Sequence, residues 1–342
     1  MGLRGAILAV LALTGAAMAE TRHTLLEFSD LDGWENDDHE AALEAFIETC
    51  PDLDPLDWQA ICVSALDSRG AARGFFEALF TPVLIEDGRE PLFTAYYEPE
   101  ISGSRFRSER FAHPVHAMPA EAKYRRPYYT RAEIDEGAID AQEVEIAYVE
   151  DPVELFFLQI QGSGRISLDE GGTLRVGYAG KNGHEYRSVG QEMVRRGLVR
   201  PTGASMQAIK SYVAENPEEG RRLLHHNPSY VFFRELGELP ADRGPLGAMN
   251  RSITPMRSIA VDPAFTPLGA PVWIETGGRS DFRRLMIAQD TGSAIKGAQR
   301  ADLFYGTGEA VGREAGSVKD PGRMVVLLPV QRAWSLLPDP LS

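Results

Sequence analysis

The chain has 342 residues, of which 43% are hydrophobic and 25% are charged, an ordinary composition for a globular protein of one large domain or two average ones. Its 35 Lys and Arg residues against 50 Asp and Glu residues give a net charge of −15. Such an acidic chain is poorly suited to nucleic acid or to an anionic membrane surface, so we expect no nucleic-acid partner. A mainly neutral polymer is not excluded.

The first nineteen residues are typical of a secretory signal. Arg4 precedes an apolar run that ends in the small-residue pattern Ala17-Met18-Ala19, which predicts cleavage before Glu20. We therefore expect an exported protein, periplasmic or associated with the outer membrane. No cysteine lies at the predicted cleavage site, so we expect no lipid anchor. An uncleaved N-terminal anchor is the alternative.

Residues 36–80 have a helical pattern, with apolar residues at helical spacing behind an acidic first turn. Cys50 and Cys62, the two cysteines of the chain, lie in this segment. Because exported proteins meet an oxidising environment, we expect a disulfide between them, with two buried thiols as the alternative.

From about Pro82 the pattern changes to short β-type runs punctuated by Gly and Pro, of which the chain has 33 and 22. The first runs are LFTAYYEP, LFFLQIQGSG and TLRVGYAGKNG. A helical stretch extends from VGQEMVRRGLV to EEGRRLLHHN, and β-type runs then return as SYVFFRE, SIAVD, PVWIET, LMIAQD and MVVLLP. The alternation is too irregular for repeated parallel β-α-β units. It predicts a mainly β protein with accessory helices.

Five motifs occur in an order that closely resembles the membrane-bound lytic transglycosylase A (MltA) family. They are FTAYYEP, LQIQGSGR, GYAGKNGHEY, GAMNRSITPMRSIAVDPAFTPLGAPVWIE and IAQDTGSAIKGAQRADLF. The resemblance extends from about Pro82 to Leu328. Its last part is similar to the family's 3D domain, named for three aspartates, which are Asp262, Asp290 and Asp302 in this chain.

The resemblance implies both a fold and an activity. The family's fold is a double-psi β-barrel with a second β-domain inserted into it and a groove between them. It implies a barrel from residues 20–104 and 243–342 and an insert from residues 105–242. The family cleaves the β-1,4 bond between N-acetylmuramic acid and N-acetylglucosamine in peptidoglycan, and the muramyl 6-hydroxyl attacks its own anomeric carbon to give a 1,6-anhydro end. The expected partner is the glycan strand, and family members work alongside other cell-wall enzymes.

Asp302 is predicted to be the catalytic acid and base. Glycosidic cleavage needs a carboxyl that is protonated near neutral pH, and the apolar neighbours Ala301 and Leu303 would raise its pKa. The family's catalytic aspartate also falls at this position. Because the substrate brings its own nucleophile, no second carboxylate is required. Asp290 is predicted to orient Asp302 or the loop between them, with turn or cap chemistry as its alternative.

Two further features of the 3D motifs bear on the site. Asp262, in an Asp-Pro pair that leaves a β-type run, is predicted to be structural. The family usually has Gly-Gly where this chain has Gly292 and Ser293, which leaves the chemistry intact if the backbone angles of Ser293 are ordinary.

The predicted substrate-binding residues are polar or aromatic and come from two motifs: Thr94, Tyr96, Tyr97, Gln159, Gln161, Ser163 and Arg165. Gln159 and Gln161 alternate with apolar residues, which predicts that both face one side of a strand. Core packing of at least one tyrosine and a solvated strand face are the alternatives. Lys296 and Arg300 either meet a lactyl or peptide carboxylate of the substrate or face solvent, and His184 is given no catalytic role.

Three other functions remain as alternatives. A peptidoglycan-binding module without catalysis could use the same fold, although it would not need Asp290 and Asp302. A two-carboxylate glycoside hydrolase would need a second acid opposite Asp302. A divalent metal site is not expected, because the spacing of the aspartates does not resemble a calcium loop, and no cofactor is predicted.

Overall fold

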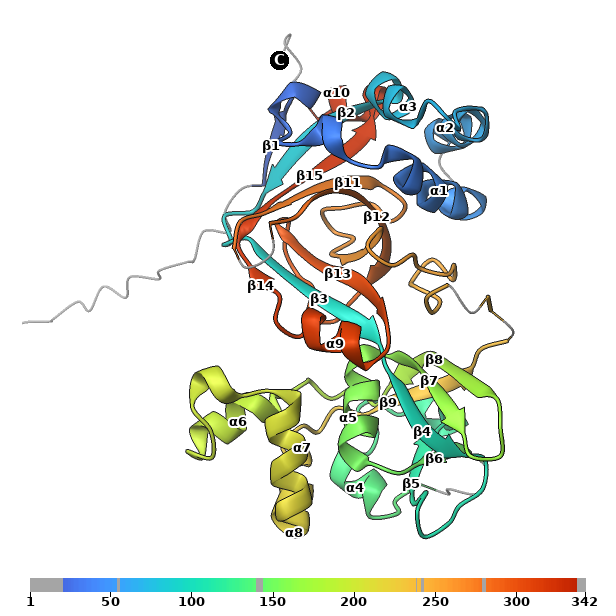
Figure 1. The fold of residues 1–342 in the computed structure, drawn as a ribbon, viewed down its shortest axis with the longest axis vertical. Coiled ribbons are helices and arrows are strands. Elements are labelled where there is room, and N and C mark those ends of the chain that lie inside the picture. The colour runs from blue at the N-terminus through green and yellow to red at the C-terminus, as the bar shows by residue number, and fades with distance from the viewer. Residues whose placement is uncertain are drawn as a thin grey trace, which may run out of the picture.

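The computed structural model describes residues 21–53, 56–139, 144–237, 239–240, 243–278 and 281–336. The predicted signal segment, residues 1–19, lies outside these ranges. Two β-sheets, each with helices and a core of its own, form two lobes (Figure 1). We call them the large-sheet lobe and the small-sheet lobe. Within the described ranges, no helix combines the length and the apolar character needed to cross a membrane.

The large-sheet lobe is built on a nine-stranded sheet of order β1-β2-β15-β11-β12-β10-β13-β3-β14. Its strands are β1 (Arg22–Leu25), β2 (Phe80–Glu86), β3 (Leu92–Glu98), β10 (Ser258–Val261), β11 (Pro271–Thr276), β12 (Arg283–Thr291), β13 (Arg300–Thr307), β14 (Lys319–Asp320) and β15 (Gly322–Pro329). The pairs β10–β12 and β13–β3 are parallel, and the others are antiparallel. The chain therefore builds this sheet from both of its ends.

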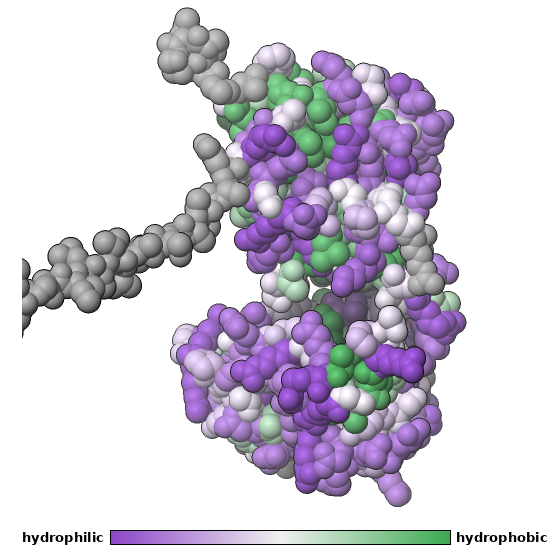
Figure 2. Space-filling model, turned by 90° about the vertical axis from the view of Figure 1, so that its left-hand side faces the viewer, coloured by the Kyte–Doolittle hydropathy of each residue, from purple (hydrophilic) through white to green (hydrophobic). Residues whose placement is uncertain are grey.

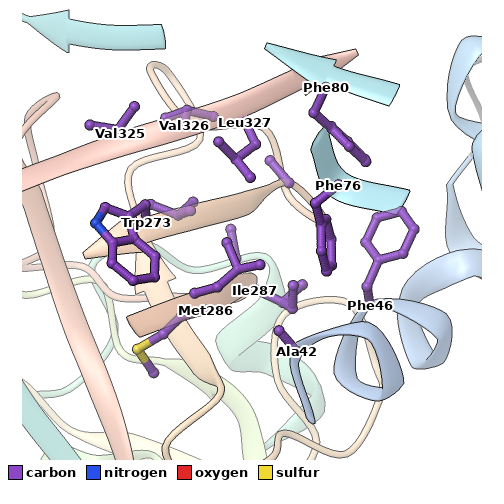
Figure 3. Close-up of a cluster of buried hydrophobic side chains, with 14 of the residues drawn as sticks. Ala42, Phe46, Phe76, Phe80, Trp273, Met286, Ile287, Val325, Val326 and Leu327 are labelled. Atoms are coloured by element: carbon purple, nitrogen blue, oxygen red, sulfur yellow. The ribbon is translucent and has the colours of Figure 1, made fainter. Parts of the chain in front are cut away.

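Helices cover the large sheet and confirm the predicted helical region of residues 36–80. They are α1 (His39–Thr49), α2 (Leu56–Asp67) and α3 (Ala72–Leu79), with α9 (Glu309–Ala315) and α10 (Val330–Trp334) near the C-terminus and the 3-10 turns η1 (Phe28–Asp30), η2 (Trp34–Asn36) and η3 (Cys50–Asp52). Phe46 of α1 and Phe76 of α3 meet Phe80 and the β-sheet in a fully buried cluster (Figure 3). Burying such a side chain stabilises the fold by about 1.5–3 kcal/mol.

Cys50 and Cys62 form the expected disulfide, which joins η3 to α2 across a sequence separation of 12 residues. We expect Cys50→Ala/Cys62→Ala to lose about 3 kcal/mol of unfolding free energy, because the crosslink restricts the unfolded chain. Thermal melting of the two proteins measures the loss. Reductant should lower the melting temperature of the native protein and leave the double variant unchanged, whereas equal melting temperatures without reductant would contradict the prediction.

The small-sheet lobe is built on a six-stranded sheet of order β5-β6-β4-β7-β8-β9. Its strands are β4 (Glu100–Ser104), β5 (His113–His116), β6 (Glu145–Val149), β7 (Ser163–Leu168), β8 (Thr173–Lys181) and β9 (Val231–Glu235). Its helices are α4 (Arg131–Asp135), α5 (Pro152–Gln161), α6 (Val189–Arg195), α7 (Met206–Glu215) and α8 (Pro217–Leu224), with the 3-10 turns η4 (Ala120–Lys123) and η6 (Pro201–Gly203). The predicted helical stretch between VGQEMV and RRLLHH is thus confirmed.

The predicted strand through LFFLQIQ is wrong, because this segment is the helix α5. The side chain of Asp151 accepts hydrogen bonds from the backbone N–H of Val153 (2.7 Å) and of Glu154 (3.3 Å) and so caps the first turn. Pro152 occupies the first helical position, and Gly162 ends the helix with a left-handed φ of 79°. All three are strong helix-boundary signals. They outweigh the alternation of four residues that suggested a strand.

The two lobes are joined at Pro99, between β3 and β4. The predicted boundary after residue 104 differs from the sheet pairing, because β4 pairs with β6 and β7 in the small sheet. We therefore propose Pro99 as the first boundary. Glu98, just before it, is fully buried and pairs with Arg165 of β7 and Arg175 of β8, each at 2.9 Å. Thr307 of β13 donates a further hydrogen bond to Glu98 (2.8 Å).

The chain returns to the large sheet through residues 236–257, and the same ion cluster holds this segment. Arg165 and Arg175 each donate a hydrogen bond to the carbonyl of Arg243 at 3.0 Å. Arg175 also reaches the carbonyl of Pro240 (3.2 Å). Both crossings between the lobes are therefore tied to one buried carboxylate.

Candidate active site

A cleft of about 720 Å³ lies between the two lobes (Figure 2). Its wall on the large-sheet lobe includes Thr94, Tyr96, Ala248, Ala260, Asp290, Ser293 and Asp302. Its wall on the small-sheet lobe includes Arg131, Gln159, Gln161, Ser163, Tyr178, Lys181 and Arg234. Among the described residues that line it, Asp290 and Asp302 are the two that carry a carboxyl.

The sheet register places the two acids on either side of Ala260. Strand β10 pairs with both neighbours, so that Ala260 lies opposite Asp290 of β12 and opposite Asp302 of β13. Adjacent strands are about 4.8 Å apart, so the two Cα atoms are roughly 10 Å apart. Ala301 and Leu303 pack in the core, and alternation therefore turns Asp302 to the opposite face, toward the cleft.

Asp290 is held by hydrogen bonds on both of its carboxyl oxygens. The hydroxyl of Tyr96 donates to Oδ2 at 2.8 Å, and the backbone N–H groups of Ala248 and Thr291 donate to Oδ1 at 3.0 and 2.9 Å. Three donors on one carboxyl favour its ionised form. Asp290 thus ties β3 and the loop before β10 to the end of β12.

Asp302 has a different environment. The hydroxyl of Thr94 donates a short hydrogen bond to Oδ1, and Arg300 donates to the same hydroxyl at 2.9 Å. Within the described part of the chain, this carboxyl accepts its hydrogen bond at Oδ1, so Oδ2 is left for a ligand. Asp302 can therefore exchange a proton with a bound molecule without breaking a contact to the protein.

Both carboxyls titrate above their ordinary range. Burial raises the pKa of Asp290 to about 6, helped by the charge of Asp302 and opposed by its three hydrogen bonds. Burial also raises the pKa of Asp302, against the Thr94 hydrogen bond and the Arg300 cation, which lower it. Burial and the charge of Asp290 raise the pKa of Tyr96 well above its usual value, so this hydroxyl stays a donor. The pKa values of both acids are raised, so the pKa values do not distinguish the two residues. Their hydrogen bonds do.

Five of the predicted binding residues line the cleft: Thr94, Tyr96, Gln159, Gln161 and Ser163. The two glutamines do not share a strand face, because they end the helix α5. Gln159 is buried and Gln161 accepts a hydrogen bond from the backbone N–H of Tyr97 at 3.2 Å. The cleft meets the end of this helix, which brings both residues to its wall.

The sequence predicts that Tyr97 and Arg165 also line the groove, but neither is among the described residues that line the cleft. Alternation along β3 turns Tyr97 away from Tyr96, and its ring packs so closely on α9 that a Cβ on Gly312 would lie 2.5 Å from it. Arg165 is engaged by the buried Glu98. Tyr97 is half-buried and is not part of the buried core of the large-sheet lobe.

Other predicted residues have structural partners. Asp262 accepts hydrogen bonds from the backbone N–H groups of Gly297 (3.0 Å) and Ala264 (3.3 Å), as a structural aspartate would. Lys296 lies 3.5 Å from Asp262. His184 contacts the carbonyl of Tyr128 at 2.8 Å. Asn250 and Met256 are the non-glycine residues with positive φ in the described part of the chain. Ser293 therefore has an ordinary backbone conformation.

The sequence alone did not identify Ala248 and Arg300 as parts of the acid wall. Ala248 contributes only its backbone N–H, and because almost every residue type has this group, the sequence does not mark the position as part of the site. Arg300 acts through Thr94, a residue 206 positions away in the chain. A pairing of β3 with β13 would have been needed to predict the contact.

Two family models and several known proteins match this chain. Residues 92–234 match the MltA specific insert domain, and residues 257–328 match the 3D domain. The membrane-bound lytic murein transglycosylase A of Vibrio cholerae is 36% identical over 262 residues, which cover 72% of this chain and 69% of that protein.

Solved structures extend the similarity to the whole fold. MltA from Neisseria gonorrhoeae is 33% identical, with a TM-score of 0.79 over 92% of this chain and 95% of its own. Escherichia coli MltA with bound chitohexaose is 29% identical, with a TM-score of 0.72 over 86% of this chain and 90% of its own. The predicted fold class is confirmed. The chain belongs to the membrane-bound lytic murein transglycosylase A family.

Proposed function

We propose that this chain is a lytic transglycosylase that cleaves the β-1,4 bond between N-acetylmuramic acid and N-acetylglucosamine, with Asp302 as the single acid and base. The supporting observation is the unequal state of the two cleft carboxyls. Among the described residues, one oxygen of Asp302 has no hydrogen-bond donor, whereas both oxygens of Asp290 accept hydrogen bonds. No other carboxyl lines the described part of the cleft.

The reaction follows from one carboxyl that changes its protonation state. Protonated Asp302 gives its proton to the glycosidic oxygen, and the bond from this oxygen to the muramyl anomeric carbon breaks. The muramyl 6-hydroxyl attacks the anomeric carbon and loses its proton to the Asp302 carboxylate, which restores the acid. Because the nucleophile is part of the substrate, its proximity replaces the second carboxylate of a hydrolase.

Asp290 is a positioning residue in this proposal. Its carboxylate holds the Tyr96 hydroxyl and the Ala248 backbone, which border the same cleft as Asp302. We assign sugar contacts to Tyr96, Gln159, Gln161 and Ser163, and to Thr94 the orientation of Asp302.

The substrate also suggests a location. Relatives carry the name membrane-bound lytic murein transglycosylase A, and one of them is solved with chitohexaose. We place this chain in the cell envelope, exported to the periplasm or associated with the outer membrane, acting on the glycan strand alongside other cell-wall enzymes.

End-group analysis tests the proposed function. Purified sacculi are digested with the native enzyme and with Asp302→Asn, and the sugar ends are identified by mass. Anhydro ends that disappear in the variant are expected. Reducing ends from the native enzyme would instead identify a hydrolase, and binding without cleavage would identify a binding module.

Arg300 offers a test of the acid through its pH dependence. Its cation lowers the pKa of Asp302, so Arg300→Gln should raise this pKa and keep the acid protonated to higher pH. We expect the alkaline limb of the kcat/KM profile to move to higher pH, and to move less in Arg300→Lys, which keeps the charge. A limb that stays in place in Arg300→Gln, in a variant that still folds by thermal melting, would remove Asp302 from the acid role.

A further inference from the structure

The small-sheet wall of the cleft carries three cations, Arg131, Lys181 and Arg234. None of the described residues that line this wall is acidic. The two acids lie on the opposite wall. We infer that the cationic wall binds carboxylates carried by the muramyl residues of the glycan. This inference rests on the proposed function and deepens it, since it concerns which form of the glycan the enzyme prefers.

Within the described ranges, no carboxylate oxygen lies within 4.0 Å of the charged nitrogens of these three cations. In a chain of net charge −15, cations are outnumbered by acids that could pair with them. Many of the other arginines do pair, as Arg105 does with Glu235 beside Arg234. Unpaired cations gathered on one wall of a cleft favour an anionic ligand.

Arg131 forms the inner part of this wall. It is 5% exposed, and it donates hydrogen bonds to the carbonyls of Asn227 (3.2 Å) and Ser229 (2.8 Å). Its guanidinium lies over the rings of Phe156 and Tyr230, at 4.7 and 5.2 Å. Carbonyl dipoles and ring faces hold the cation without neutralising it, so its charge acts on the cleft.

Lys181 and Arg234 form the outer part. Lys181 ends β8 opposite Val231, and Arg234 of β9 lies opposite Gly177. Three residues of strand separate the two cations along β9, which is roughly 10 Å. Lys181 is half-buried and Arg234 is exposed, and Arg234 donates a hydrogen bond across to Asn250 of the large-sheet lobe at 3.1 Å.

The glycan bears its charge on one substituent. The lactyl group of N-acetylmuramic acid carries a free carboxylate when the stem peptide has been removed, and otherwise the peptide carries the carboxylates. Lys296 and Arg300, the cations that the sequence suggests for this task, are engaged by Asp262 and by Thr94. A strand whose anionic substituents face the small-sheet lobe would lie between the cationic wall and the opposite wall, where Asp302 lies.

The test separates charge from sugar contacts. Lys181→Gln/Arg234→Gln removes two charges, Lys181→Arg/Arg234→Lys keeps them, and Arg332→Gln removes a charge from exposed α10, outside the cleft. KM is measured on peptide-bearing strands and on amidase-treated strands with free lactyl carboxylates. The dissociation constant of chitohexaose, which is uncharged, is measured by calorimetry.

We expect the double Gln variant to raise KM for the charged strands roughly tenfold, as the loss of charge-assisted contacts would, and to change chitohexaose affinity less than twofold. Loss on peptide-bearing strands alone assigns the wall to the peptide carboxylates, and loss on amidase-treated strands alone assigns it to the lactyl carboxylate. Loss on both shows that the wall binds either carboxylate. The charge-keeping variant and Arg332→Gln should resemble the native enzyme.

Equal weakening of chitohexaose would overturn the inference, as would an unchanged KM in a variant that melts like the native protein. High salt should shrink the difference between the native enzyme and the Gln variant. Reducing ends produced by the native enzyme would defeat the proposed function but leave this comparison of KM values readable.

Discussion

Replacing Asp302 by Asn is expected to lower kcat on isolated glycan strands by about 10³-fold, the scale of a lost general acid. Asn has nearly the same shape and can still accept the hydrogen bond of Thr94. It cannot give a proton to the glycosidic oxygen, so only the chemical step should fail. The rate of anhydro-end formation, followed by mass, measures kcat, and KM should change little.

Asp290→Asn is the matched control for this substitution. Its side chain keeps one oxygen, but its amide group would face donors that now bind a carboxylate. We expect a loss of about tenfold, because a positioning contact is disturbed and the acid is kept. If instead Asp302→Asn stayed active and Asp290→Asn did not, the two roles would have to be exchanged.

Replacing Glu98 by Ala is expected to cost about 3–5 kcal/mol of unfolding free energy, because it leaves the buried Arg175 and the partly buried Arg165 without their shared partner. Arg175 is 8% exposed and Arg165 is 16% exposed at their side chains, so water can replace little of what is lost. Chemical denaturation measures the difference. Activity should fall as well, since the cluster ties both crossings between the walls of the cleft.

A surface ion pair supplies the control. Glu309 and Arg313 pair at 2.8 Å on α9, with side chains 75% and 65% exposed, and such a pair contributes at most about 1 kcal/mol. Glu309→Gln should therefore hardly change stability. A Glu98→Ala protein as stable as Glu309→Gln would show that the cluster does not hold the lobes together.

Local sequence signals predicted much of the large-sheet lobe. The helices of residues 36–80, the disulfide and the apolar flanks of Asp302 depend on neighbours in sequence, and these predictions are confirmed by the structure. The error at α5 was also local. The alternation of Gln159 and Gln161 indicates a strand, but Asp151, Pro152 and Gly162 are helix-boundary signals, and they prevail in the structure.

The contacts that the sequence did not predict join residues that are far apart in the chain. Glu98 meets Arg165 and Arg175 only because β3 runs directly into the small sheet, over separations of 67 and 77 residues. The cationic wall likewise gathers Arg131, Lys181 and Arg234 from three elements. None of these residues belongs to a pattern with a fixed spacing, so their common location depends on the fold.

The order of strands gives the two walls different freedom to change during evolution. Strands β12, β10 and β13, which hold the acids, lie inside the nine-stranded sheet, where each has a neighbour on both sides. Strand β9, which carries Arg234, is at the edge of its sheet. A substitution or bulge in an edge strand disturbs hydrogen bonds to one neighbouring strand, whereas a change in an interior strand disturbs hydrogen bonds to two. The contact made by Arg234 is therefore freer to change than the strands that hold the two acids.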